Sequence, residues 1–399
     1  MLNTPQYRFR NSLTAGIISA FVVLAVASSD RAGAQVAPYE LNVVLSRTGP
    51  GAFIGSKNVD MFTALETAVN ATGGIKGQPL KLVFSDDQTN PQIAVQLVNG
   101  LISRKVSVIL GPNITGSCAA VQPIVERDGP VVACLSPGLI PHENTYMFLA
   151  APTLDDVEPV LLRYAKSRSW TRLGLINTTD ASGQDFERRL DPILARAEFR
   201  GLQIVAREHF APTDLDVTGQ VVRIKASRPD VLFSVAIGTS LGTLLRSINN
   251  VGLDIPIFAS GANMNATQLS QYVSFLPKEL FFNAMRGIDV EPNAPRAIKA
   301  AQSFYFEAMK KAGFRVEAGT TIAWDLSLVV VEALRHVGTD ATAQQIFQYM
   351  QGLRSWTGVQ GTYNFSTHDQ RGIGEAAAAF FRWDAAKGDF VMIYPTVKR

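Results

Sequence analysis

Histidine, cysteine and known catalytic motifs are scarce in this chain of 399 residues. The four histidines include no His-x-x-x-His pair, which argues against a zinc site because such sites usually assemble three or four close ligands. No Gly-x-Gly-x-x-Gly loop follows the first predicted strand, and neither a Gly-x-Ser-x-Gly elbow nor a Gly-Lys-Ser/Thr phosphate loop occurs. We therefore expect no metal, no cofactor and no enzymatic activity.

Concentrated charge is also missing from the sequence. The chain has 37 Lys and Arg against 34 Asp and Glu, without a basic cluster. Proteins that bind nucleic acids or anionic membranes do so through concentrated Lys and Arg. The composition thus argues against both kinds of partner and favours a small or locally complementary one.

The N-terminal segment, residues 1–34, has the pattern of a secretory signal peptide. Arg8 and Arg10 precede an apolar run over 13–27, and the Ala-Gly-Ala sequence that ends at residue 34 provides a cleavage site. The run of about 15 residues is shorter than the roughly 20 of a spanning helix, so a membrane anchor is the weaker alternative. We expect cleavage before Gln35. This removes three Arg and one Asp and leaves 34 basic and 33 acidic residues.

The chain has only two cysteines, Cys118 and Cys134. Export to an oxidising compartment favours a disulfide between them, and two free buried thiols are the alternative. A nucleophilic role for Cys118 is disfavoured, because no histidine partner is evident. We predict the disulfide.

Short β-rich runs alternate with amphipathic helices along most of the chain. Over residues 56–71, for example, Val59, Phe62 and Leu65 recur at helical spacing after a strand predicted at 41–45. This alternation is typical of an α/β fold with parallel sheets. The mature chain of about 365 residues exceeds what one hydrophobic core usually supports, so we expect two lobes.

The same patterns predict the other elements. Further strands are predicted at 80–84, 106–110, 131–134, 172–177, 202–207, 231–236, 255–259, 361–365, 377–383 and 390–394. Further helices are predicted at 117–127, 155–167, 186–199, 217–226, 241–251, 294–312, 319–337 and 343–351. The final helices and strands fit neither half alone, which suggests that the chain crosses again between the lobes.

Ligands of open parallel sheets bind outside the carboxyl ends of the strands. The predicted loops there are 46–55, 111–117, 135–141, 178–184, 237–241 and 260–265, with Asp86 and Asp87 on the far side of the first sheet. They are rich in Gly, Ser, Thr and Asn. Hydroxyls such as those of Thr115, Ser117 and Ser136 suit a carboxylate or another small polar head group, and helix capping alone is the alternative.

Five segments resemble the periplasmic leucine/isoleucine/valine-binding proteins: 46–55 (SRTGPGAFIG), 73–77 (GGIKG), 86–87 (DD), 111–112 (GP) and 135–138 (LSPG). The resemblance implies a type I binding protein with two doubly wound parallel-sheet lobes and three hinge crossings near Thr153, Gly287 and Gly361. One lobe would contain 39–153 and 288–360, and the other 154–287 and 361–399. It also implies a periplasmic, monomeric protein that delivers a small molecule to the permease subunits of an ABC importer.

The resemblance and the strand-end loops together predict the ligand site. By position, Phe53 or Ile54 would contact the ligand, Thr115 would hold a carboxylate and Gly138 would contribute its backbone. The complete candidate site is Phe53, Ile54, Asn113, Thr115, Ser117, Ser136, Gly138, Leu139, Ser182, Ile237 and Gly261.

Departures from the family pattern bear on the ligand. Ile140 stands where amino-acid binders have a Thr for the head group, and Gly261 stands where they have an acidic residue for the ammonium. Ser182 and Ile237 replace residues that are often Tyr. Because an ammonium without an anionic partner is costly to bury, we predict a carboxylate on an aromatic or hydrophobic body without an α-ammonium, with Phe53, Leu139 and Ile237 as apolar walls.

Three other functions remain open at this point. The protein could bind a branched-chain amino acid in the same transport role, or act as a periplasmic ligand sensor on the same fold. The third alternative is an exported α/β enzyme, which is disfavoured because no nucleophile, acid/base group and orienting group fall together in the sequence.

Overall fold

A computed structural model describes residues 36–289, 291, 293–317, 320–365 and 370–394. The predicted signal peptide and its cleavage site before Gln35 lie outside these residues. Residues 37–399 form one compact unit. Within the described ranges, no helix has both the length and the apolar character needed to cross a membrane.

The first lobe is built on a parallel sheet of five strands in the order β2-β1-β3-β4-β5. The strands are β1 (Tyr39–Leu45), β2 (Leu80–Asp86), β3 (Val108–Leu110), β4 (Val131–Ala133) and β5 (Met147–Phe148). Side chains alternate between the two faces, as the β period requires: Val43 packs in the core on one face and Val44 in the core on the other.

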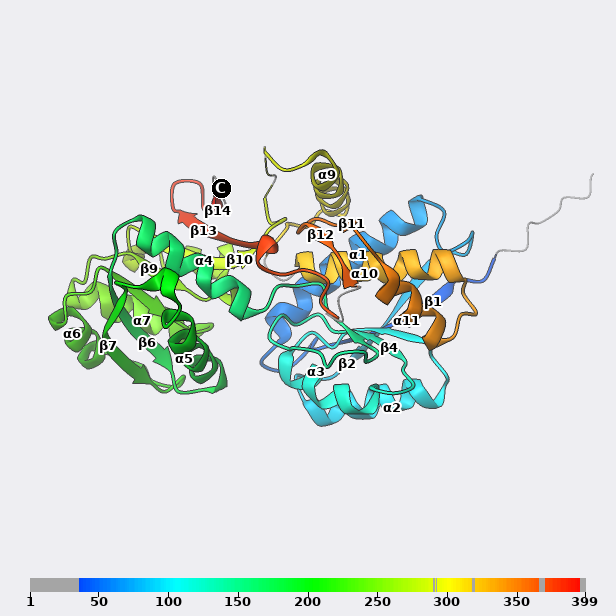
Figure 1. Cartoon of the computed structure of the whole chain (residues 1–399), viewed down its shortest axis with the longest axis horizontal. Coiled ribbons are helices and arrows are strands. Elements are labelled where there is room, and N and C mark those ends of the chain that lie inside the picture. The colour runs from blue at the N-terminus through cyan, green and yellow to red at the C-terminus, as the bar shows by residue number, and fades with distance from the viewer. Residues whose placement is uncertain (1–35, 290, 292, 318–319, 366–369, 395–399) are drawn as a thin grey trace, which may run out of the picture. The chain divides into compact units, whose positions relative to one another are not determined.

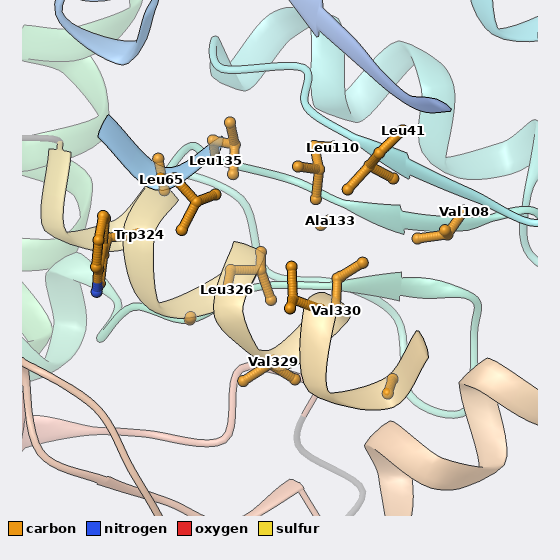
Figure 2. Packing of buried hydrophobic residues seen from close by; sticks show 14 of the residues in the cluster. Leu41, Leu65, Val108, Leu110, Ala133, Leu135, Trp324, Leu326, Val329 and Val330 are labelled. Carbon is orange, nitrogen blue, oxygen red and sulfur yellow. The ribbon is translucent and has the colours of Figure 1, made fainter. Parts of the chain in front are cut away.

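Helices cover both faces of this sheet. On one side pack α1 (Ala52–Ala71), α9 (Arg296–Lys311), α10 (Thr320–Val337) and α11 (Ala343–Gly352), and on the other α2 (Pro91–Ser103) and α3 (Thr115–Val121). Figure 2 shows Leu326 and Val330 of α10 beneath Leu110 and Ala133 of the strands. The apolar run of α10 is thus a core helix, as its sequence predicted.

The second lobe is built on a seven-stranded sheet in the order β14-β13-β10-β9-β8-β6-β7. Its parallel strands are β6 (Arg172–Thr178), β7 (Gln203–Phe210), β8 (Val231–Ser234), β9 (Ile257–Ala259) and β10 (Leu280–Met285). Two antiparallel strands, β13 (Ala378–Asp384) and β14 (Asp389–Tyr394), extend it beside β10. On one face lie α4 (Leu154–Ser167) and α5 (Ala181–Leu194), and on the other α6 (Thr218–Ala226) and α7 (Thr239–Val251), most of them drawn in green (Figure 1).

The chain passes between the two sheets three times. It leaves the first sheet after β5, returns after β10, and leaves again after a small pair formed by β11 (Trp356–Thr357) and β12 (Thr362–Tyr363). The predicted fold class, two α/β lobes with three crossings, is therefore confirmed. At the third passage, Phe365 and Ile373 still pack in the core of the first lobe, whereas Ala378 packs in that of the second.

Several elements differ from the sequence prediction. The strands β5 and β10 and the short helix α8 (Ala266–Ser270) were not predicted. The helix predicted at 186–199 begins five residues earlier, at Ala181, because the Asp180 side chain accepts a hydrogen bond from Gly183 N at 3.2 Å and caps it. Part of the predicted loop 178–184 is therefore helical.

Candidate functional site

A cavity of about 590 Å³ opens at the carboxyl ends of the strands of both sheets. From the first lobe, the segments after β1, β3 and β4 line it, and from the second the ends of β8, β9 and β10 with faces of α4 and α5. Its volume falls in the range of about 300–1,000 Å³ typical of small-molecule sites. The position agrees with the rule for open α/β sheets.

Most predicted site residues meet at this cavity. Nine of the eleven line it: Phe53, Ile54, Asn113, Thr115, Ser136, Gly138, Ser182, Ile237 and Gly261. Ser117 and Leu139 are not among the lining residues, because both are buried behind it in the layer between the sheet and α2 and α3. Ile140 is 61% exposed and does not line the cavity either, so it gives no information on the ligand's head group.

Two hydroxyls form the most polar point on the first-lobe wall. Thr115 Oγ1 and Ser136 Oγ lie 2.7 Å apart, which is hydrogen-bond distance. A Cβ atom at Gly138 would lie 2.5 Å from Thr115 Oγ1, so the glycine leaves the space beside this hydroxyl empty. Thr115 also begins α3, where unpaired backbone amides favour an anion. The arrangement suits a carboxylate or another small polar group.

Asn113 lines the same wall but has its polar atoms engaged within the protein. Its Oδ1 accepts a hydrogen bond from Ser46 N at 2.9 Å, and its Nδ2 donates to Asn58 Oδ1 at 3.0 Å. The side chain therefore ties the loop after β3 to the loop after β1 and to α1. Its effect on the site is to position neighbouring groups.

A disulfide joins the two segments that carry these hydroxyls. Cys118 and Cys134 are bonded, with Cα atoms 6.0 Å apart. Cys118 lies one helical turn after Thr115 on α3, and Cys134 lies two residues before Ser136 at the end of β4. The bond thus holds the start of α3 against the end of β4.

The prediction that Asp86 and Asp87 lie on the far side of the first sheet is wrong, because β2 runs parallel to β1 and both strands end at the same carboxyl edge. There the two residues organise the loop that carries Phe53. Asp86 accepts hydrogen bonds from Arg47 N, from Thr48 N and from the Thr48 hydroxyl, and Asp87 Oδ1 accepts one from Ser46 Oγ at 2.6 Å. Burial raises the pKa of Asp86, but the hydrogen bonds from Thr48 and nearby backbone amides outweigh it and lower that pKa. Asp86 therefore stays charged, and the hydrogen bonds of both residues fix the loop.

Charged residues on the second-lobe wall were not predicted. Glu158 on α4 is 2% exposed, and its Oε1 lies 3.4 Å from Arg189 Nε on α5. Its Oε2 has no hydrogen-bond partner among the described residues. Burial raises the pKa of Glu158 to about 8, although Arg189 lowers it. An unpaired buried polar atom costs about 1–3 kcal/mol. Ser234 Oγ and Thr321 Oγ1, which also belong to lining residues, lack a partner among the described residues as well, but Glu158 is the one carboxyl group of the three.

A family model for periplasmic binding proteins matches residues 38–389 of the chain. The chain belongs to this family. The match spans both lobes and all three crossings, and so agrees with the position of the cavity between two α/β units. The resemblance inferred from the sequence motifs is confirmed.

Individual relatives of this periplasmic binding protein are distant. Leu/Ile/Val-binding protein homolog 3 of Brucella melitensis biotype 1 is 21% identical over 361 residues, which cover 89% of this chain and 94% of that protein. The Leu/Ile/Val-binding protein of Escherichia coli (strain K12) is 25% identical over 239 residues, or 58% of this chain and 62% of that protein.

Solved structures share the fold of this binding protein. An extracellular ligand-binding receptor from Rhodopseudomonas palustris HaA2 matches with a TM-score of 0.73 and 20% identity, covering 89% of this chain and 99% of that chain. The substrate binding protein LivJ from Streptococcus pneumoniae, solved with isoleucine, matches with a TM-score of 0.70 and 17% identity, covering 89% and 99%.

In this binding protein, the acids that line the cavity are paired with bases. Glu158 contacts Arg189, Asp185 contacts Arg188 at 2.9 Å, and Glu317 lies 3.7 Å from Lys57. Gly261, predicted from the sequence to occupy the position of an acidic residue of the family, has no room for a side chain. A Cβ there would lie 1.8 Å from Asn283 O.

The charged second-lobe wall was not predicted from the sequence, because the position of these residues depends on which face of a helix packs toward the cavity. On α4, the cavity-lining residues recur at spacings of three and four: Leu154, Val157, Glu158 and Leu161. Such residues share one face of a helix. The spacing was visible in the sequence, but only the packing of α4 shows that this face looks into the cavity.

A buried polar network joins the three crossings. The Asp325 carboxylate on α10 accepts hydrogen bonds from Val359 N at 2.9 Å and Gln360 N at 3.1 Å in the turn between β11 and β12, which leads into the third crossing. Gln360 Nε2 donates to Ala150 O at 2.8 Å in the first. Gln302 Nε2 bridges Val359 O, at 3.1 Å, and Glu291 Oε1, at 3.2 Å, in the second. Burial raises the pKa of Asp325 to about 6, against the lowering effect of its donors.

Proposed function

We propose that this protein is the periplasmic solute-binding component of an ABC importer, exported with cleavage before Gln35. The observation that carries the proposal is a cavity lined by strand ends of both lobes in a member of the periplasmic binding protein family. Ligand bound there would contact both lobes at once and so favour their closure, which a permease can recognise. The protein acts as a receptor and carrier, as a monomer.

The lobes we propose are residues 39–153 with 288–360, and residues 154–287 with 361–399. The core contacts of Phe365 and Ile373 with the first lobe support a third crossing that extends over about 361–377. The strand order supports the other two crossings.

The ligand we propose is a carboxylate with an apolar or aromatic body and without an α-ammonium. Thr115, Ser136 and the backbone of Gly138 would hold the carboxylate, and Phe53, Phe233 and Phe258 would contact the body. The pairing of Asp185 with Arg188 and of Glu317 with Lys57 supports the absence of an ammonium, because a charge buried without a free partner is costly.

A branched-chain amino acid is the second candidate. It is favoured by the relatives named as Leu/Ile/Val-binding proteins, one of which matches over 94% of its length. An amino acid would also offer its carboxylate to Thr115 and Ser136. Near Thr115 and Ser136, the two candidate ligands, the apolar acid and the amino acid, differ only in the α-ammonium group.

Thermal unfolding of the mature chain with candidate ligands separates the two. Benzoate, 3-phenylpropanoate, leucine and valine would each be titrated, since a ligand that binds only the folded state stabilises it by about 2.7 kcal/mol at one hundred times its Kd. We expect a rise in Tm with 3-phenylpropanoate that Thr115→Ala reduces. Thr67→Ala, which removes an exposed hydroxyl from α1, is the matched control and should respond like the wild type. Strong stabilisation by leucine or valine, with none by the aromatic acids, would overturn the proposed ligand class.

A further inference from the structure

We propose that Glu158 is a second recognition point of the cavity, which pairs with a neutral hydroxyl or carbonyl group on the part of the ligand that contacts the second lobe. The inference rests on the proposed solute-binding function and extends it. The ligand would then carry two polar ends, a carboxylate for Thr115 and Ser136 and an uncharged hydrogen-bonding group for Glu158, separated by an apolar body.

Glu158 shares the second-lobe wall with a group of apolar side chains. Val157 and Leu161, on the same face of α4, pack with Phe186, Phe233 and Phe258 in the core of the second lobe, and all five also line the cavity. The Phe233 and Phe258 rings are stacked with centroids 4.9 Å apart. A ligand body that enters between the lobes therefore meets an aromatic surface with Glu158 on the same wall, and the charged side chains of α5 also line this wall.

Half of that carboxyl group lacks a partner. Oε1 faces Arg189, whereas Oε2 is buried and unbonded among the described residues. Buried polar atoms in folded proteins nearly always have a partner, and exceptions call for an explanation. Because Glu158 lines the cavity, a bound ligand is the partner that we assign to Oε2.

The charged neighbours of Glu158 argue for an uncharged ligand group. The three that act on it are Asp155 on α4 and Asp185 and Arg189 on α5, and Arg188 pairs with Asp185. Arg189 Nη1 donates a hydrogen bond to Asp185, and Arg189 Nε lies 3.5 Å from Asp155 Oδ1. Glu158 therefore shares the Arg189 guanidinium with two other acids.

The protonation state follows from that competition. Burial raises the pKa of Glu158 to about 8 in spite of Arg189, so at neutral pH the carboxyl holds a proton and can donate from Oε2. A hydroxyl or carbonyl oxygen accepts such a bond. A ligand ammonium would instead require the ionised carboxylate.

Calorimetry with two matched acids tests the inference. 3-(4-Hydroxyphenyl)propanoate and 3-phenylpropanoate differ by one hydroxyl, and we expect the wild type to prefer the former by about tenfold at pH 7. Glu158→Gln keeps a neutral donor and acceptor and should keep the preference. Glu158→Leu should abolish it while 3-phenylpropanoate still binds, which shows that the variant is folded.

Asp155→Asn is the matched control, because Asp155 contacts the same arginine but is not among the lining residues. It should retain the tenfold preference.

Other outcomes would overturn the inference. A wild type that does not distinguish the two acids, or a Glu158→Leu variant that still does, removes the role of Glu158 and leaves the proposed transport function intact. Preference for 3-(4-aminomethylphenyl)propanoate that disappears in Glu158→Gln would show a charged partner instead. Binding of none of these acids, together with binding of leucine, would overturn the proposed ligand class and this inference with it.

Discussion

At the scale of single residues, two properties shape the cavity. One is the space that glycines leave beside polar groups, and the other is the protonation of a buried acid. Gly138 leaves room beside the Thr115 hydroxyl, and Gly261 leaves room only for the backbone of Asn283. Glu158 is the buried acid on the second-lobe wall. Each of these features yields a test with a matched control.

Gly138→Ala should abolish ligand stabilisation while leaving the unliganded protein folded. The added Cβ would stand 2.5 Å from Thr115 Oγ1, in the space we assign to the ligand carboxylate. The measurement is the change in Tm with 3-phenylpropanoate. Gly100→Ala is the control, because nothing lies within 4 Å of its Cβ position on α2. It should keep the ligand response and gain about 0.5–1 kcal/mol of stability.

Glu158 should make stability depend on pH. Its pKa is about 8 in the folded protein against a reference value of 4.5, so the folded state holds more protons between these values. The free energy of unfolding should therefore fall as pH rises from about 4.5 to about 8. In Glu158→Gln this part of the decline should vanish, a difference on the order of 1–3 kcal/mol at pH 8. Denaturant titrations of both proteins at pH 5 and pH 8 measure the free energy of unfolding. If it changed by the same amount between these pH values in both proteins, the raised pKa of Glu158 would be contradicted.

At the scale of secondary-structure elements, the site is made by the ends of strands and the starts of helices. The disulfide fixes the start of α3 against the end of β4, and Asp86 and Asp87 fix the loop before α1. The Asp180 cap starts α5 early enough to bring Asp185 and Arg189 to the cavity.

Replacing both cysteines, Cys118→Ala with Cys134→Ala, should lower the free energy of unfolding by about 3 kcal/mol. The bond closes a loop of sequence separation 16, and its loss frees the unfolded chain. The affinity for 3-phenylpropanoate should also fall, because Thr115 and Ser136 lose a shared anchor. Guanidinium unfolding and calorimetry measure the two effects. Reduction of the wild type should reproduce both, and an unchanged affinity would contradict the anchoring role.

At the scale of the whole molecule, the three crossings act together. Asp325, Gln360 and Gln302 link them by buried hydrogen bonds, so movement of one crossing strains its bonds to the others. A Cβ at Gly358 would lie 2.5 Å from the Asp325 carboxyl group, which shows how closely the third crossing follows α10.

Asp325→Asn should destabilise the protein by about 1.5–3 kcal/mol. Both carboxylate oxygens accept from backbone amides, and an asparagine would turn an N–H toward one of these donors. Ligand affinity should change as well, because we propose that ligand binding closes the lobes about these crossings. Chemical unfolding and calorimetry test both effects, with the exposed Asp340→Asn as the control. A variant as stable as the wild type would contradict the proposed linkage.

Much of the fold was predictable because its signals are local. The helical spacing of Val59, Phe62 and Leu65 and the short β-rich runs predicted most elements within a few residues. The two-residue β5 was too short for any pattern to show. The strand β10 was missed although Phe281 and Phe282 alternate between two buried faces, because its run of apolar residues also suits a buried helix.

The sequence by itself determined the α/β architecture and the first-lobe part of the candidate site. Parallel strands bring their carboxyl ends to one edge, so Thr115 and Ser136 had to lie near each other once the strands were assigned. Only the tertiary structure decided that Leu139 is buried behind the cavity, that Glu158 and Arg189 meet on its second-lobe wall, and that Asp325 joins the crossings. Those outcomes depend on the direction in which a helix or loop face packs. That direction is set by contacts between segments far apart in the chain, which no local pattern records.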